Sequence, residues 1–106
     1  MYGSEVMQRS AAVATVQLEN DRVRVTEWRF VPGAATGFHR HEHDYVVVPL
    51  TTGSLLLLEN GEEREARLSV GGSYFRSAGV EHDVVNASGG EFVFVEVELK
   101  SPTGQR

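Results

Sequence analysis

The chain contains no cysteine among its 106 residues. Disulfide bonds and thiolate metal sites are therefore excluded, and any metal ion would have to be bound through nitrogen or oxygen. Basic residues are also few: 10 Lys and Arg stand against 15 Asp and Glu, the net charge is −5, and no basic cluster is present. These numbers argue against nucleic acid and against acidic membrane surfaces as partners.

Long apolar runs are missing as well. No stretch is long enough for a signal peptide or a membrane span, so we expect a cytoplasmic protein. The length suits one domain, and a domain this small would gain from pairing with a second copy, which predicts a homodimer. Because both ends are polar, we expect a flexible N-terminal segment over residues 1–11, one domain over 12–100 and a flexible tail over 101–106.

A helical period is the last notable absence, and what remains is a series of short β-like runs separated by turn signals. The strongest turn signal is Asn60-Gly61, which suits a two-residue hairpin. The expected strands cover residues 13–18, 23–31, 39–43, 45–50, 54–59, 62–68, 73–77, a run from 82 and 91–99. Strands this short and this regularly spaced predict an all-β protein, either a closed barrel or a two-sheet jelly roll.

Histidine is scarce but concentrated. His39, His41 and His43 alternate within five residues, and His82 is the fourth and last. In a β-strand alternate side chains share a face, so the first three should point the same way. Two imidazoles at that spacing can bind one cation at roughly 2.0–2.1 Å, and a third from another strand can complete the site. The pattern therefore predicts a metal centre.

Two glycine and histidine motifs make the chain resemble the small cupins. Both motifs keep the spacing of that family: Gly33, five residues, His39-Arg-His41, with Gly53 at the end; then Gly71, five residues, Ser77-Ala-Gly79, two residues, His82, three residues, Asn86. The resemblance implies a jelly-roll β-barrel of two antiparallel sheets. It also implies His39, His41 and His82 as ligands of one divalent transition metal ion per chain, with Fe, Ni and Zn as candidates. Asn86 is expected to bond a turn backbone.

The glutamate of the first cupin motif is absent. Its place is taken by Tyr45 or Val46, depending on the spacing chosen. Tyr45 and His43 have the parity of the histidine face, so either could replace the missing ligand, and they are the only candidates for a general base. A tyrosine ligand would need the metal to lower its pKa from about 10.

Two acidic and two aromatic side chains outside the histidine motifs are further candidates for the site or its surroundings. Glu96 and Glu98 alternate with apolar residues, which favours solvent or a dimer interface, although Glu96 could supply the missing carboxylate if it faced the cavity. Phe38 and Phe75 flank the motifs and are expected to touch a substrate.

Over residues 21–33, 38–53 and 74–100 the chain is similar to short cupins associated with β-alanine degradation, including the run Asp44-Tyr-Val-Val-Val-Pro-Leu. This resemblance implies a metal-dependent enzyme, oxygenase-like or isomerase-like, acting on a small carboxylic or amino-acid-derived substrate. The alternative is a non-catalytic module that binds a small ligand, with the metal absent or only structural. A sugar isomerase is a third interpretation, disfavoured by the short chain.

Overall fold

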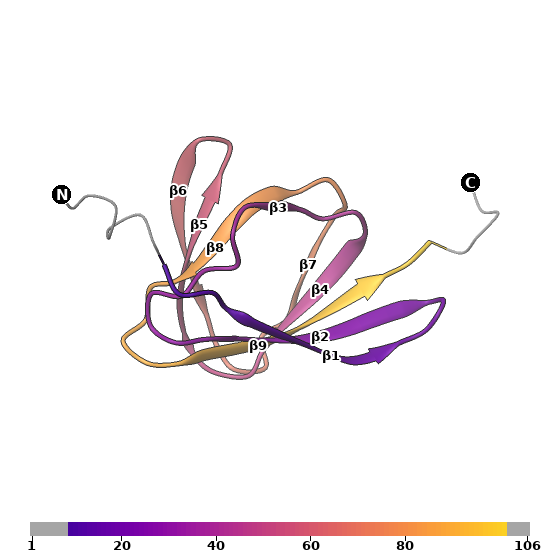
Figure 1. Cartoon of the computed structure of the whole chain (residues 1–106), viewed down its shortest axis with the longest axis horizontal. Helices are drawn as coiled ribbons and strands as arrows, with labels where there is room; N and C mark the ends of the chain where they lie inside the picture. The colour runs from indigo at the N-terminus through magenta and orange to yellow at the C-terminus, as the bar shows by residue number, and fades with distance from the viewer. Residues whose placement is uncertain (1–8, 102–106) are drawn as a thin grey trace.

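The structure, a computed structural model, describes residues 9–101, which form nine β-strands and no helix (Figure 1). The strands are β1 (Val13–Glu19), β2 (Val23–Phe30), β3 (His39–Arg40), β4 (Asp44–Pro49), β5 (Gly53–Glu59), β6 (Glu62–Leu68), β7 (Tyr74–Arg76), β8 (Glu81–Asn86) and β9 (Phe92–Leu99). Most of the expected strand ends agree with these bounds to within one residue. Nothing in the described part of the chain is a helix that could cross a membrane.

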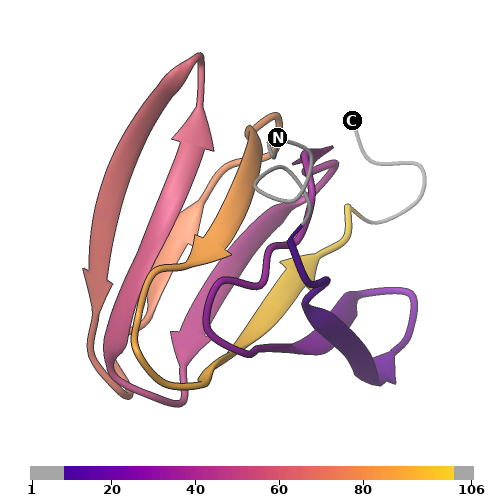
Figure 2. The same ribbon diagram turned by 60° about the vertical axis from the view of Figure 1, so that its left-hand side comes forward.

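The strands form two antiparallel sheets that face each other (Figures 1 and 2). One sheet has the order β1-β2-β9-β4-β7 and the other the order β3-β8-β5-β6. The chain changes sheet repeatedly, so residues distant in sequence meet inside the barrel. This arrangement confirms the predicted all-β jelly roll.

The core lies between the sheets and follows the period of two expected for strands with one buried face. On β9 the side chains of Phe92 and Phe94 point inward and are almost fully buried. Phe30 of β2 lies opposite Phe92 in the ladder and packs against Phe94, with ring centroids 5.6 Å apart. From the opposing sheet, Leu55 and Leu57 of β5 complete the same cluster. The buried faces of both sheets thus form one continuous core.

The hairpin between β5 and β6 turns at Asn60-Gly61, as predicted. Both residues have positive φ angles, 57° and 74°. A two-residue turn of this kind requires that conformation, and asparagine and glycine adopt it at the lowest cost.

The histidine segment differs from the expected strand over 39–43. The β3 ladder ends at Arg40. His41 makes two further backbone hydrogen bonds, its N–H to the Val80 carbonyl and its carbonyl from the Gly79 N–H, both at 2.8 Å. The chain then bends at His43 and crosses to β4 in the other sheet. This crossing breaks the alternation, so the prediction that His43 shares the face of the other two was wrong.

The expected flexible ends fall mainly outside the described residues, at 1–8 and 102–106. Within the described residues, backbone hydrogen bonding to the rest of the domain begins slightly before residue 12, where the domain was expected to start. The Ala35 N–H donates to the Ser10 carbonyl, and the Ala12 N–H donates to the Ala35 carbonyl, both at 2.9 Å.

Candidate metal centre

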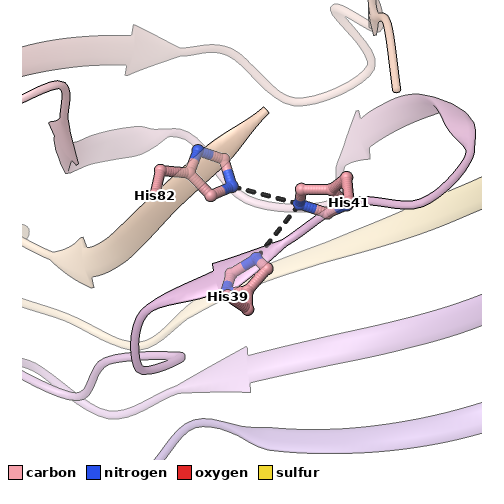
Figure 3. Close-up of side chains that lie close together, drawn as sticks. All are labelled: His39, His41 and His82. Carbon is pink, nitrogen blue, oxygen red and sulfur yellow. Dashed lines mark hydrogen bonds between the residues drawn. The ribbon is translucent and has the colours of Figure 1, made fainter. Parts of the chain in front are cut away.

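Three histidines from different parts of the chain meet at one end of the barrel (Figure 3). His39 of β3 lies directly opposite His82 of β8 in the ladder, which brings their side chains together. His41, held by its backbone bonds to the turn before β8, adds the third ring. His41 and His82 are buried, whereas His39 is partly exposed.

The Nε2 atoms of the three rings converge. The Nε2 atom of His41 lies 3.0 Å from that of His39 and 3.1 Å from that of His82. With metal–nitrogen bonds near 2.05 Å, two ligands at a right angle lie about 2.9 Å apart, and two in a tetrahedron about 3.4 Å apart. The observed separations are close to the first value. The three rings could therefore hold one metal ion, on adjacent positions and with space left for other ligands.

The contacts of the opposite ring nitrogens of His39 and His41 agree with this interpretation. Nδ1 of His39 lies 2.8 Å from the Gly37 carbonyl oxygen, which can only accept, so Nδ1 carries the proton and Nε2 the lone pair. Nδ1 of His41 faces a carboxylate oxygen of Glu96 at 3.5 Å. These contacts leave the Nε2 lone pair of His39 free and favour the same tautomer for His41, whereas Nδ1 of His82 is buried without a hydrogen-bond partner in the described residues. Converging Nε2 lone pairs are the donor set of a cation site.

Burial keeps these rings neutral. It lowers the pKa of His41 to about 4, aided by the proximity of His39 and His82. Burial also lowers the pKa of His82 to about 4, with His39 as the next cause. Because only a neutral imidazole can bind a metal ion, both ligands are ready at neutral pH.

Tyr45 stands next to His41 and is, with Val46, one of the two residues that could occupy the glutamate position of the first cupin motif. Its ring stacks on the His41 ring, with centroids 3.9 Å apart and planes 17° from parallel. The side chain points inward, as its parity predicted, and its hydroxyl is buried without a hydrogen-bond partner in the described residues. Burial raises the pKa of the Tyr45 phenol, so the group is neutral and can donate a proton in a hydrogen bond.

Glu96 is buried and lines the same cavity, so the expectation of solvent or an interface was wrong for it. One carboxylate oxygen accepts a hydrogen bond from Trp28 Nε1 at 3.3 Å. Burial raises the pKa of Glu96 to about 7, and the negative charge of nearby Glu98 adds to the effect. Glu98 is buried too, but it is paired with Arg24 at 2.6 Å. The sequence placed both acids on one face without showing that this face is the interior.

Two spaces adjoin the histidines. The interior cavity lies between the histidines, Tyr45 and the leucines of β5, and its free volume of about 20 Å³ has room for little more than a water molecule. On the other side, a groove of about 330 Å³ runs between the β1–β2 hairpin and β3, with His39 and His41 in its wall. The groove has the size of a small-molecule site.

Three of the residues proposed from sequence lie elsewhere. Phe38 and Phe75 are 68% and 55% exposed and line neither space, so neither space supports the expectation that they touch a substrate. His43 is partly buried and is also absent from both linings.

Asn86 of the second motif supports the backbone, as expected. Its side chain donates to the carbonyls of Phe30 at 3.2 Å and Gly90 at 2.9 Å, and accepts from the Ser88 N–H at 2.8 Å. These bonds fix the turn between β8 and β9, not the metal centre itself.

Comparison with known proteins agrees with the fold. A family model described as a cupin domain matches residues 26–98. The chain is 63% identical over 92 residues to the β-alanine degradation protein BauB of Pseudomonas aeruginosa. The aligned region covers 87% of this chain and 97% of the relative.

Among solved structures, a cupin domain from Bordetella pertussis is 57% identical, with a TM-score of 0.87 over 90% of this chain and 99% of the other. A double-stranded β-helix protein from Klebsiella pneumoniae is 22% identical, with a TM-score of 0.72 over 98% of this chain and 92% of the other, and shares the fold. With two motifs in order, two facing sheets and a matching family model over most of its length, this chain belongs to the cupin-domain family.

Proposed function

We propose that the protein is a metal-dependent enzyme that acts on a small carboxylic or amino-acid-derived compound. The observation that carries this proposal is the convergence of three Nε2 atoms beside an open groove. His39, His41 and His82 would hold one divalent ion per chain, with Fe, Ni and Zn as the candidates for an all-nitrogen set. When bound, such an ion would supply Lewis-acid chemistry, and redox chemistry if it is iron.

The groove, and not the interior cavity, is proposed as the substrate site, because only the groove has room for an organic molecule. It carries two arginines. Arg24 is already paired with Glu98, whereas Arg40 is exposed and makes no ion pair within residues 9–101. Arg40 lies between His39 and His41 in sequence and lines the groove, and its guanidinium would favour a substrate with a carboxylate. The relative from Pseudomonas aeruginosa is named for β-alanine degradation, which is consistent with that class.

Tyr45 is proposed as a hydrogen-bond donor at the inner side of the site, where its hydroxyl has no partner. A neutral phenol at this place would stabilise negative charge that develops on a bound oxygen or would orient a water molecule. His43 was the other candidate for a catalytic residue. Since it lines neither space, Tyr45 carries the proposal.

Metal analysis tests the proposal directly. Protein expressed with Fe, Ni or Zn supplied should contain close to one ion per chain, and His82→Ala should lose it while keeping the far-ultraviolet circular dichroism spectrum of the folded protein. Glu81→Ala serves as the matched control, because Glu81 directly precedes His82 on β8, is exposed and belongs to neither group of possible ligands. Wild type with far less than one ion per chain would contradict the proposal and favour a non-catalytic ligand-binding module.

Substrate class needs a second experiment. Short carboxylic acids, with β-alanine among them, should raise the melting temperature of the metal-loaded protein and be consumed or converted in an assay that follows them by chromatography. Arg40→Gln should weaken this binding, whereas Arg67→Gln, an exposed arginine on β6 outside the groove, should not. Equal binding by the two variants would remove Arg40 from the site.

A homodimer is also proposed, from the outer face of the five-stranded sheet. One cross-strand row on that face is apolar in every strand: Leu18, Val25, Val97, Val46 and Phe75. Leu18 and Phe75, at its two ends, are more than half exposed. Sedimentation analysis should give a dimer that Val46→Lys, in the middle of the row, converts to a monomer; a monomeric wild type would contradict this.

A further inference from the structure

Glu96 is a buried acid in the middle of a sheet. It lies on β9 between Thr26 of β2 and Val47 of β4, and this register directs its side chain into the barrel. A carboxylate in such a place is costly unless a partner compensates it. No Lys or Arg of residues 9–101 forms an ion pair with it, whereas Glu98, two residues along the strand, has Arg24. Packing alone therefore gives no reason for an acid at position 96.

The two carboxylate oxygens of Glu96 have different neighbours. Oε1 accepts the indole N–H of Trp28 at 3.3 Å, and Oε2 lies 3.5 Å from Nδ1 of His41. Nδ1 is on the side of the ring away from Nε2, the atom that faces His39 and His82. Glu96 lies outside the group of atoms that His39, His41 and His82 bring together, and instead forms a second buried group with His41 and Glu98. It therefore stands behind His41 and is not a fourth ligand.

We infer that Glu96 is a positioning residue of the metal centre: its carboxylate accepts the Nδ1 proton of His41, which leaves Nε2 bare and aimed at the ion, while Trp28 fixes the carboxylate. The inference rests on the proposed three-histidine metal site. It also accounts for the missing motif glutamate. Neither Tyr45 nor Val46, the two residues that could occupy that position, is a carboxylate, and Glu96 would supply a negative charge from β9 on the far side of one ligand.

The consequence for metal binding follows from how histidine ligands work. A carboxylate that accepts the second ring proton fixes the tautomer and makes the ligating nitrogen more basic. Loss of such a partner commonly weakens metal binding by about 10- to 100-fold. Trp28 acts one step further away, so its removal should have a smaller effect in the same direction.

The decisive experiment combines a metal-free and a metal-loaded measurement on wild type, Glu96→Gln, Glu98→Gln and Trp28→Phe. Glutamine keeps the shape of the side chain and removes its charge. Nitrogen NMR of the His41 ring in metal-free protein at pH 8 reports the tautomer, and competition titration with Zn²⁺ reports affinity. Glu98→Gln removes an equally buried charge from the same strand face and so controls for net charge.

We expect Nδ1-protonated His41 in wild type and in Glu98→Gln, and a mixed or Nε2-protonated ring in Glu96→Gln. Zn²⁺ affinity should fall about 10- to 100-fold in Glu96→Gln and less in Trp28→Phe. The inference is overturned if Glu96→Gln changes neither tautomer nor affinity, or if Glu98→Gln weakens binding as much. If Glu96→Gln does not fold, Trp28→Phe decides by the same two readings. A wild type that binds no Zn²⁺ refutes the metal site, while the tautomer in metal-free protein still tests the contact.

Discussion

Raising the pH should destabilise the metal-free protein through one carboxyl group, that of Glu96. Burial raises its pKa from the ordinary value of 4.5 to about 7. The folded state then binds this proton more tightly than the unfolded state does. The stabilising contribution is complete below about pH 4.5 and is lost as the pH rises through 7. Between pH 5 and pH 8 the loss from this group alone amounts to about 2 to 3 kcal/mol.

The buried histidines act in the opposite direction over part of this range. The pKa values of His41 and His82 are lowered to about 4, so the unfolded state takes up their protons first as the pH falls below 6.5, and acid destabilises the fold through them. Both rings are present in Glu96→Gln as well. The difference between wild type and this variant therefore isolates the carboxyl group.

Urea unfolding in the presence of a chelator, at pH 5 and at pH 8, measures the effect. Going from pH 5 to pH 8, wild type should lose about 2 to 3 kcal/mol of unfolding free energy relative to Glu96→Gln. Parallel pH profiles for the two proteins would refute the reasoning, because they would mean that the carboxyl group titrates normally in the folded state.

Three further substitutions test the surroundings of the site. Tyr45→Phe removes a buried hydroxyl that has no hydrogen-bond partner in the described residues, so the free energy of unfolding should stay equal or rise by up to about 1–3 kcal/mol. Metal content should not change. A marked loss of stability would reveal a hydrogen bond to that hydroxyl. Asn86→Ala breaks three hydrogen bonds to the backbone and should lower the free energy of unfolding by about 2–4 kcal/mol. The folded variant should keep its full metal content, and loss of the ion would place Asn86 in the metal centre itself. Gly53→Ala puts a Cβ 2.3 Å from Ser88 Oγ and 2.9 Å from the Phe92 ring, so urea unfolding should register a loss of about 1–3 kcal/mol, and an unchanged midpoint would mean that the two neighbours move aside freely.

The strands and the meeting of His39, His41 and His82 could be predicted from the sequence because both depend on local spacing. Turn residues such as Asn60-Gly61 mark the ends of strands, and the two cupin motifs carry their histidines at fixed separations. Where the chain leaves a ladder is not a local property. The end of β3 after Arg40 is set by the crossing to the other sheet, and for that reason the parity argument failed at His43.

The buried position of Glu96 could not be predicted from the sequence, for a related reason. Alternation along β9 shows that Glu96, Glu98, Phe92 and Phe94 share a face. Two aromatic residues favour the interior and two acids favour solvent, and the pattern does not choose. The choice is made by partners from elsewhere in the chain, Arg24 for one acid and Trp28 with His41 for the other.

The three histidines belong to both halves of the barrel. His39 and His82 lie in the four-stranded sheet, while His41 leads into β4 of the five-stranded one, and the ladder between β3 and β8 is only two residue pairs long. An ion bound here would fasten the weakest seam of the molecule and add about 2.7 kcal/mol to its resistance to unfolding at a hundredfold excess over the dissociation constant. Under the proposed metal site, the supply of that ion in the cell would therefore affect how well the folded protein resists proteolysis.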